Sequence, residues 1–179
     1  MALSNRMMGA ALVQDADETR YQLATDRFSM ERSRTEGIQT RASQGMGVSG
    51  TLMTLFLVLG NSALSNLKNT NPLIAYLQGS LIIGLILFAI DLLVFLYANR
   101  FATYRFDPSP SAITGGLAKL KNPDLMRQVT SNVVDATLYN HGLNDFKTGV
   151  IKVGYYLLGI SVFAIVLFGI ELVYAFGLQ

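Results

Sequence analysis

The distribution of charged side chains divides the chain into long apolar stretches separated by polar ones. Residues 42–67 carry no charge, residues 73–99 carry only Asp91, and residues 153–179 carry only Glu171. A membrane-spanning helix needs about 20 predominantly apolar residues to cross roughly 30 Å of hydrocarbon. Each stretch is therefore long enough to cross, and we predict an all-α integral membrane protein with three transmembrane helices.

The polar stretches predict cytoplasmic helical extensions of these spans. Residues 15–41 contain good helix formers and no proline, and Arg27–Glu31 and Arg32–Glu36 are spaced as i,i+4 pairs. The apolar positions in this stretch are sparse, which favours a solvated amphipathic stem over a dedicated binding surface. We expect this stem helix to continue directly into the first span.

A second extension is predicted before the third span. Asn122 has the side chain of an N-cap, Pro123 suits the first turn, and Asp124 suits the positive end of the helix dipole. The apolar residues that follow recur at roughly helical spacing and form one face. A short polar turn over residues 66–72 joins the first two spans, so we expect them to form an antiparallel hairpin.

These elements divide the chain into four parts without internal repeats or low-complexity tracts. The predicted parts are an N-terminal cytoplasmic stem helix at 1–41, a transmembrane hairpin at 42–99, a cytoplasmic loop and helix at 100–152, and a third transmembrane span at 153–179.

The basic residues predict an orientation, because Lys and Arg near span ends stay cytoplasmic. Six of the 14 lie before the first span, seven lie between the second and third spans, and only Lys68 lies between the first two spans. We therefore expect a protein of the cell membrane with its N-terminus in the cytoplasm and its C-terminus outside.

Composition and motifs exclude several functional classes. The net charge of +2 and the lack of a basic run argue against nucleic-acid binding, and the chain has no cysteine and one histidine, His141. Phosphate-binding loops, the GxSxG elbow and the HExxH and CxxC motifs are all absent from the sequence. We predict a protein that is not an enzyme and that uses no cofactor and no metal.

The two acids within the predicted spans are the strongest site candidates, because ionisable residues at that depth are costly and usually face protein or water. Asp91 lies about 13 Å along its helix from Arg100, and Glu171 lies about 28 Å from Lys152. The two acids are therefore not expected to pair within one chain. Asp91 fits either a structural hydrogen bond to Ser, Thr or Asn of the first span or a role facing a pore or partner, and Glu171 fits the outer interface.

The first span is rich in small residues. Ser43, Gly47 and Thr51 are spaced by four, as are Gly50 and Thr54. Such rows let helix backbones approach closely in lipid. We expect this span to lie inside a bundle or at a contact between subunits, so the predicted partners are the lipid bilayer and either further copies of the chain or other membrane subunits.

The order of these parts resembles a known group of proteins. The stem ends in EGIQTRA at residues 36–42, the second span exits through YRFDP at residues 104–108, and the next helix carries Leu125, Asn140 and Lys147. This layout resembles the small prokaryotic transmembrane proteins related to the Pycsar effectors and the SLATT domains. The resemblance implies a helical membrane effector or sensor that oligomerises and perturbs or permeates the membrane in immunity.

Two functional hypotheses follow. The first is a self-assembling, non-enzymatic membrane protein that forms a pore or perturbs the membrane, with cytoplasmic helices that mediate assembly or sensing. The alternative is an accessory structural subunit of a larger membrane complex, such as a respiratory or transport assembly. Purification separates them, because the first predicts a complex of one species and the second predicts unrelated subunits that persistently co-purify.

Overall fold

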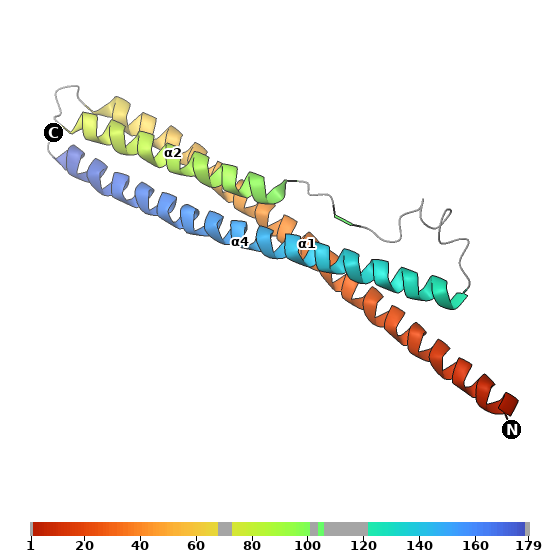
Figure 1. The fold of residues 1–179 in the computed structure, drawn as a ribbon. Helices are drawn as coiled ribbons and strands as arrows, with labels where there is room; N and C mark the ends of the chain where they lie inside the picture. Colours follow the sequence, from red (N-terminus) through yellow and green to blue (C-terminus); the bar gives the residue numbers. More distant parts are fainter. Residues whose placement is uncertain (1, 68–72, 101–103, 106–121, 178–179) are drawn as a thin grey trace. The chain divides into compact units, whose positions relative to one another are not determined.

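The computed structural model describes residues 2–67, 73–100, 104–105 and 122–177, with side chains described from residue 16 onward in the first range and from residue 124 onward in the last. These residues form three α-helices and no strand (Figure 1). The helices are α1 (Ala2–Asn66), α2 (Ile74–Asn99) and α4 (Asn122–Gly177). The predicted all-α fold is thus confirmed.

Each of the three helices contains a segment long and apolar enough to cross a membrane. In α1 and α4 this apolar segment continues a polar one without a break in the helix. The predicted continuity of the stem helix with the first span, and of the helix that begins at Asn122 with the third span, is therefore confirmed. The predicted turn over residues 66–72 lies mostly outside the described residues.

The chain forms two compact units. The first comprises Met1–Gly37 and Phe101–Asp145, and the second comprises Ile38–Arg100 and Phe146–Gln179. The second unit therefore holds most of the charge-poor sequence, whereas the first holds most of the charged side chains.

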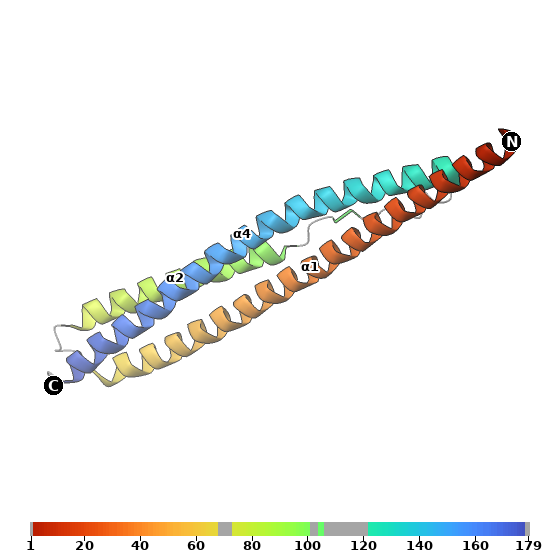
Figure 2. The same cartoon turned by 90° about the horizontal axis from the view of Figure 1, so that it is seen from below.

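The second unit is a three-helix bundle (Figure 2). Phe56 of α1 packs against Phe88 of α2 and Phe168 of α4, with ring centroids 6.3 and 5.3 Å apart. Contacts between α1 and α2 run in opposite sequence directions, from Ser49–Asp91 to Phe56–Phe88, so the hairpin is antiparallel. The rest of this core is apolar and is contributed by Leu67, Leu77, Leu81 and Ala175.

The buried positions of the bundle follow a seven-residue repeat. Those of α2 alternate between spacings of three and four: Leu77, Leu81, Gly84, Phe88, Asp91, Phe95 and Ala98. Within the second unit, α4 likewise buries every seventh residue from Gly154 to Ala175. A period of 3.5 residues is shorter than the 3.6 of a straight α-helix, so the helices pack as in a left-handed coiled coil.

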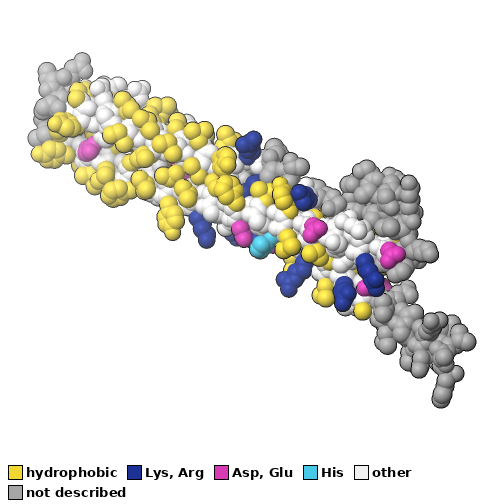
Figure 3. Space-filling model, viewed as in Figure 1, with side chains coloured by type: hydrophobic (Ala, Val, Ile, Leu, Met, Phe, Trp, Pro, Cys, Tyr) yellow, Lys and Arg dark blue, Asp and Glu magenta, His cyan; other side chains and the backbone are white. Residues whose placement is uncertain are grey.

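Four glycines provide space for large side chains at this seam. A Cβ at Gly45 or Gly154 would overlap the ring of Phe95, one at Gly84 would overlap the ring of Phe56, and one at Gly60 would overlap Leu81. The outer surface of α2 and α4 carries large apolar side chains instead, and Figure 3 shows how densely hydrophobic side chains cover these helices. Such a surface suits contact with lipid.

The first unit pairs the initial part of α1 with the initial part of α4. Among its described residues, the buried apolar side chains are few and small, namely Ala24, Val133 and Ala136. Polar contacts supply much of the remaining pairing. At one end Arg127 Nε donates to Asp17 Oδ2 at 3.0 Å, and the carboxylate of Asp17 is nearly buried. The two helix segments run in the same direction, because increasing positions of α1 meet increasing positions of α4.

Candidate functional site

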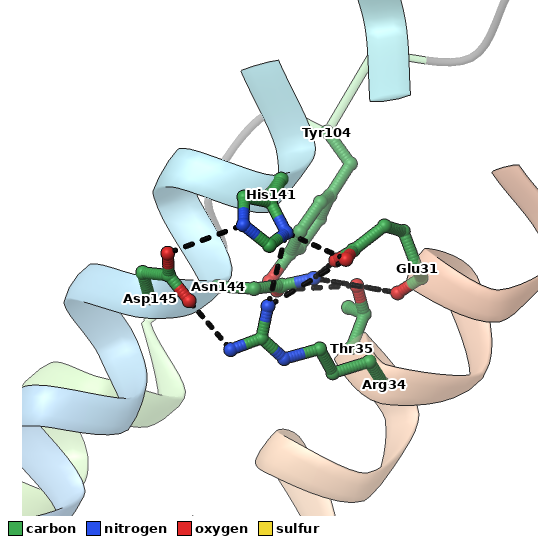
Figure 4. Close-up of polar contacts among 7 residues, drawn as sticks. All are labelled: Glu31, Arg34, Thr35, Tyr104, His141, Asn144 and Asp145. Carbon is green, nitrogen blue, oxygen red and sulfur yellow. Dashed lines mark hydrogen bonds and ion pairs between the residues drawn. The ribbon is translucent and has the colours of Figure 1, made fainter. Parts of the chain in front are cut away.

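The densest group of polar contacts lies in the first unit and is called the polar network here (Figure 4). Its members are Glu31, Arg34, Thr35, Tyr104, His141, Asn144 and Asp145. Successive turns of α1 supply the first three and successive turns of α4 supply the last three. Tyr104 comes from a separate segment and directs its hydroxyl to Asn144.

Arg34 connects the two helices by ionic contacts. Its Nη2 donates to Asp145 Oδ1 at 2.6 Å, and its Nη1 lies 3.5 Å from Glu31 Oε1 on the preceding turn of α1. A guanidinium group has five donors in a fixed plane, so it can bond two carboxylates at once. Arg34 therefore joins an acid of α4 to an acid of its own helix.

Asn144 is the most deeply buried member of the network, with a side chain that is 0% exposed. Its Nδ2 donates to Glu31 Oε2 at 2.9 Å, while its Oδ1 accepts from Tyr104 at 3.3 Å. Thr35 Oγ1 lies within hydrogen-bond distance of both amide atoms, at 3.1 Å from Nδ2 and 3.2 Å from Oδ1. Because both ends of the amide are bonded, this buried polar group is stabilising rather than costly.

His141 lies between charges of both signs. Its Nδ1 is 2.7 Å from Glu31 Oε1 and 3.2 Å from Arg34 Nη1, and its Nε2 is 3.4 Å from Asp145 Oδ2. Nδ1 donates to Glu31 when it carries a hydrogen and accepts from Arg34 when it does not. A doubly protonated ring can donate to both carboxylates, so the charge on the imidazole alters the balance of the whole network.

The network changes the acidity of its carboxyl groups. Burial alone would raise the pKa of Glu31, but hydrogen bonds from His141 and Asn144 and the charge of Arg34 outweigh it, so the pKa lies below its usual range. The hydrogen bond from Arg34 is the main cause that lowers the pKa of Asp145. Both carboxylates are thus held in the ionised form that the network requires.

A second polar contact attaches the segment 104–105 to α4. The backbone N–H of Arg105 donates to Asn140 Oδ1 at 3.0 Å, and Asn140 Nδ2 donates to the carbonyl oxygen of Arg105 at 2.9 Å. The amide of Asn140 thereby satisfies both backbone groups of one residue. The guanidinium carbon of Arg105 also lies 4.4 Å from the ring centre of Tyr139, a cation–π distance.

Asp91 lies in the interior of the second unit and is 0% exposed. Ser49 Oγ of α1 donates to Asp91 Oδ2 at 2.5 Å, whereas Asp91 Oδ1 has no partner among the described residues. One of the two interpretations left open by the sequence, a hydrogen bond to a hydroxyl of the first span, is therefore present in the structure.

Glu171 is exposed and accepts a hydrogen bond from Ser80 Oγ of α2 at 2.5 Å. Ser80 precedes Asp91 by eleven residues on α2, which is about 16 Å along a helix. The two acids within the spans therefore lie at different levels of the bundle and have separate hydroxyl partners.

The small residues of the first span divide between two faces of α1. Ser43, Gly47, Thr51 and Thr54 are exposed, and a Cβ on half-buried Gly50 would lie 3.7 Å from the side chain of Leu92. The close helix contacts within the chain are made by other small residues of α1, namely Ala42, Gly45, Ser49 and Gly60. The row at Ser43, Gly47 and Thr51 thus does not pack inside the bundle, and its role between subunits stays a prediction.

No protein-family model, no curated protein and no solved structure matches this chain. Among the side chains that the structure describes, no group of three or more His, Asp or Glu is placed to hold a metal ion. The polar network was not anticipated from the sequence, because its two helices contribute residues more than 100 positions apart.

Proposed function

We propose that the protein is a non-enzymatic, self-assembling membrane protein whose copies associate through the exposed small-residue face of α1. The observation that carries this proposal is a row of small residues on the outer face of α1. Gly47, Thr51 and Thr54 are exposed in succession along this helix, beside exposed large apolar residues such as Val48 and Leu55. Hydroxyl groups and glycine gain little from lipid contact, but they favour close helix packing.

The proposed assembly forms a pore or perturbs the membrane, and any ion path lies between copies of the chain. Within one copy, aromatic side chains fill the bundle on both sides of Asp91. Phe95 occupies the space beside Gly45 and Gly154 on one side, and the cluster around Phe56 occupies the other. A path between copies would instead be lined by hydroxyl groups of α1, which suit a hydrated channel.

The first unit then serves as the sensing or assembly part of an effector or sensor. The basic-residue asymmetry supports a cytoplasmic location for this unit. Its polar network contains one histidine between two carboxylates and an arginine, so the charge of that side chain offers a means of response. The layout resemblance to Pycsar-related and SLATT proteins supports the same role.

The mass of the complex extracted in mild detergent is the decisive measurement. Self-assembly predicts one species whose mass is an integer multiple of the chain, and ion flux through vesicles that contain it then tests the pore. Persistent co-purification of unrelated subunits, with the isolated chain monomeric, would replace the proposal by the accessory-subunit alternative.

The orientation has its own test. Lys68 lies between the first two spans and Lys119 between the second and third. The proposed topology predicts that an amine reagent that cannot cross the membrane labels Lys68 in intact cells and leaves Lys119 unlabelled. Labelling of Lys119 with Lys68 protected would invert the orientation.

A further inference from the structure

The side chain of Phe95 on α2 meets α1 and α4 at one height along the axis of the bundle. Its ring occupies the space where a Cβ would lie at Gly45 on α1 and at Gly154 on α4. The same ring packs edge-on against Tyr155, with centroids 5.2 Å apart. Positions on all three helices can therefore be measured from this level along the bundle axis.

Each helix places one exposed cation just beyond that level. On α1, Arg41 precedes Gly45 by four residues. On antiparallel α2, Arg100 follows Phe95 by five residues, and on α4, Lys152 precedes Gly154 by two residues. At 1.5 Å per residue, these positions lie about 6, 7.5 and 3 Å from Phe95 in the same direction. The three side chains therefore share one narrow band at one end of the unit.

Acidic partners for these cations are lacking among the described residues. None of Arg41, Arg100 and Lys152 belongs to an observed ion pair. The acids of the same unit are engaged elsewhere, since Asp91 is buried with Ser49 and Glu171 accepts from Ser80. Glu171 also lies seventeen residues beyond Gly154, about 26 Å toward the opposite end.

Tyrosines lie at the band and on its apolar side. Tyr97, Tyr155 and Tyr156 are exposed, and each lies within about 3 Å of the Phe95 level along its helix. Tyrosine is enriched where a membrane meets water, because its ring prefers the apolar side and its hydroxyl the polar side. This level therefore matches the boundary at which lipid phosphates lie.

We propose that Arg41, Arg100 and Lys152 form a collar that binds the phosphate groups of anionic phospholipids. Two of the three are arginines, whose planar guanidinium can donate two parallel hydrogen bonds to one phosphate. Lys147 is not part of the collar, because it is 4% exposed and its Nζ donates to the carbonyl oxygen of Arg100 at 2.8 Å. This inference is independent of self-assembly, since one copy supplies all three cations.

The test measures which lipids stay bound to the protein. The full chain is reconstituted in vesicles that contain equal amounts of phosphatidylcholine and phosphatidylglycerol with the same acyl chains, and native mass spectrometry counts the lipids retained after mild extraction. We expect retained phosphatidylglycerol to exceed its share of the vesicle. In Arg41→Gln/Arg100→Gln/Lys152→Gln we expect its binding to fall at least about tenfold, since each basic residue near an anionic surface contributes about fivefold.

A matched variant controls for net charge. Arg20→Gln/Arg27→Gln/Arg32→Gln removes the same charge from exposed positions of the first unit. We expect it to retain phosphatidylglycerol as the unmodified protein does. An equal loss in this control would show that net charge alone attracts the lipid, and the collar would be rejected.

Two further measurements on the unmodified protein keep the proposal testable if the triple variant fails to fold. Enrichment should weaken as salt is raised, because exposed charges are screened. Excess inorganic phosphate at constant ionic strength should leave the lipid bound, because the acyl chains hold it at the bilayer surface. The proposal would be overturned if both lipids were retained in the proportions of the vesicle, or if the enrichment of phosphatidylglycerol did not change with salt. It would also be overturned if inorganic phosphate displaced phosphatidylglycerol, because the site would then bind the free anion.

Discussion

Lys147 Nζ lies 2.8 Å from the backbone carbonyl oxygen of Arg100, so an ammonium group of α4 satisfies the C-terminal end of α2. Carbonyl groups at a helix C-terminus have no partner within the helix and carry partial negative charge. A charged hydrogen bond therefore joins the C-terminal end of α2 to α4.

We expect Lys147→Met to destabilise the second unit, because it leaves that carbonyl without its donor inside the protein. The expected loss is about 1–3 kcal/mol, measured as a lower unfolding temperature in detergent. Lys152→Met, at an exposed position of the same helix, should leave the unfolding temperature nearly unchanged. Equal effects of the two variants would argue against a specific role for the contact.

Gly45 and Gly47 are near neighbours on α1 that we expect to respond differently to the same change. Gly45→Leu should destabilise the chain itself by about 1–3 kcal/mol or more, because the new side chain meets the ring of Phe95. Gly47→Leu should preserve the fold, since nothing lies within 4 Å of its Cβ position. It should instead weaken association between copies, seen as a smaller complex in mild detergent. A complex of unchanged mass in Gly47→Leu would place the subunit contact elsewhere.

Asp91 is expected to act as a structural residue. Asp91→Asn keeps the shape and an oxygen that can accept from Ser49, so the fold and the assembly should be retained. Because Phe95 and the Phe56 cluster fill the bundle on either side, any ion flux through reconstituted protein should also be unchanged. Altered ion selectivity in a variant that still assembles would instead place the charge of Asp91 on the conduction path.

The carboxylates of the polar network predict a dependence on pH in the acidic range. The pKa of Glu31 and that of Asp145 are lowered in the folded protein, so their stabilising contribution is present above the ordinary carboxyl pKa. It is lost as pH falls through the lowered folded values. Hydrogen-exchange protection of the first unit should therefore decrease as the pH falls below about 4.

Glu31→Gln should lower that protection at neutral pH and weaken its decrease in acid. Glu171→Gln, outside the first unit, is the control and should leave the profile of the first unit unchanged. Protection that stays constant through the acidic range in the unmodified protein would contradict a stabilising role for these carboxylates.

The helices and their continuity were predictable because length and charge decide them. No membrane span tolerates a run of charges, and nothing in α1 or α4 interrupts a helix, since their sequences lack proline apart from Pro123 in the first turn of α4. The hydroxyl partner of Asp91 was also foreseen as a class, because a buried acid needs a donor and the first span is rich in hydroxyls.

The inner face of the spans was not predictable in the same way. Both faces of a membrane helix are apolar, so hydropathy does not distinguish the side that meets protein from the side that meets lipid. Gly45 and Gly47 look equivalent in sequence, and only the position of Phe95 separates them. The polar network was missed for another reason, because its contacts join Glu31 and Arg34 to residues far away in the sequence.

The pairing of Phe95 with Gly45 and Gly154 also determines which registers the hairpin can adopt. A seam that repeats every seven residues would pack almost as well after one helix slipped by a full repeat. Such a slip would bring Leu52 or Ser161 to the ring in place of glycine, and each carries a side chain where the ring now lies. The packing of one aromatic ring against two glycines thus excludes the alignments shifted by one seven-residue repeat. The three helices therefore have a single alignment in the bilayer.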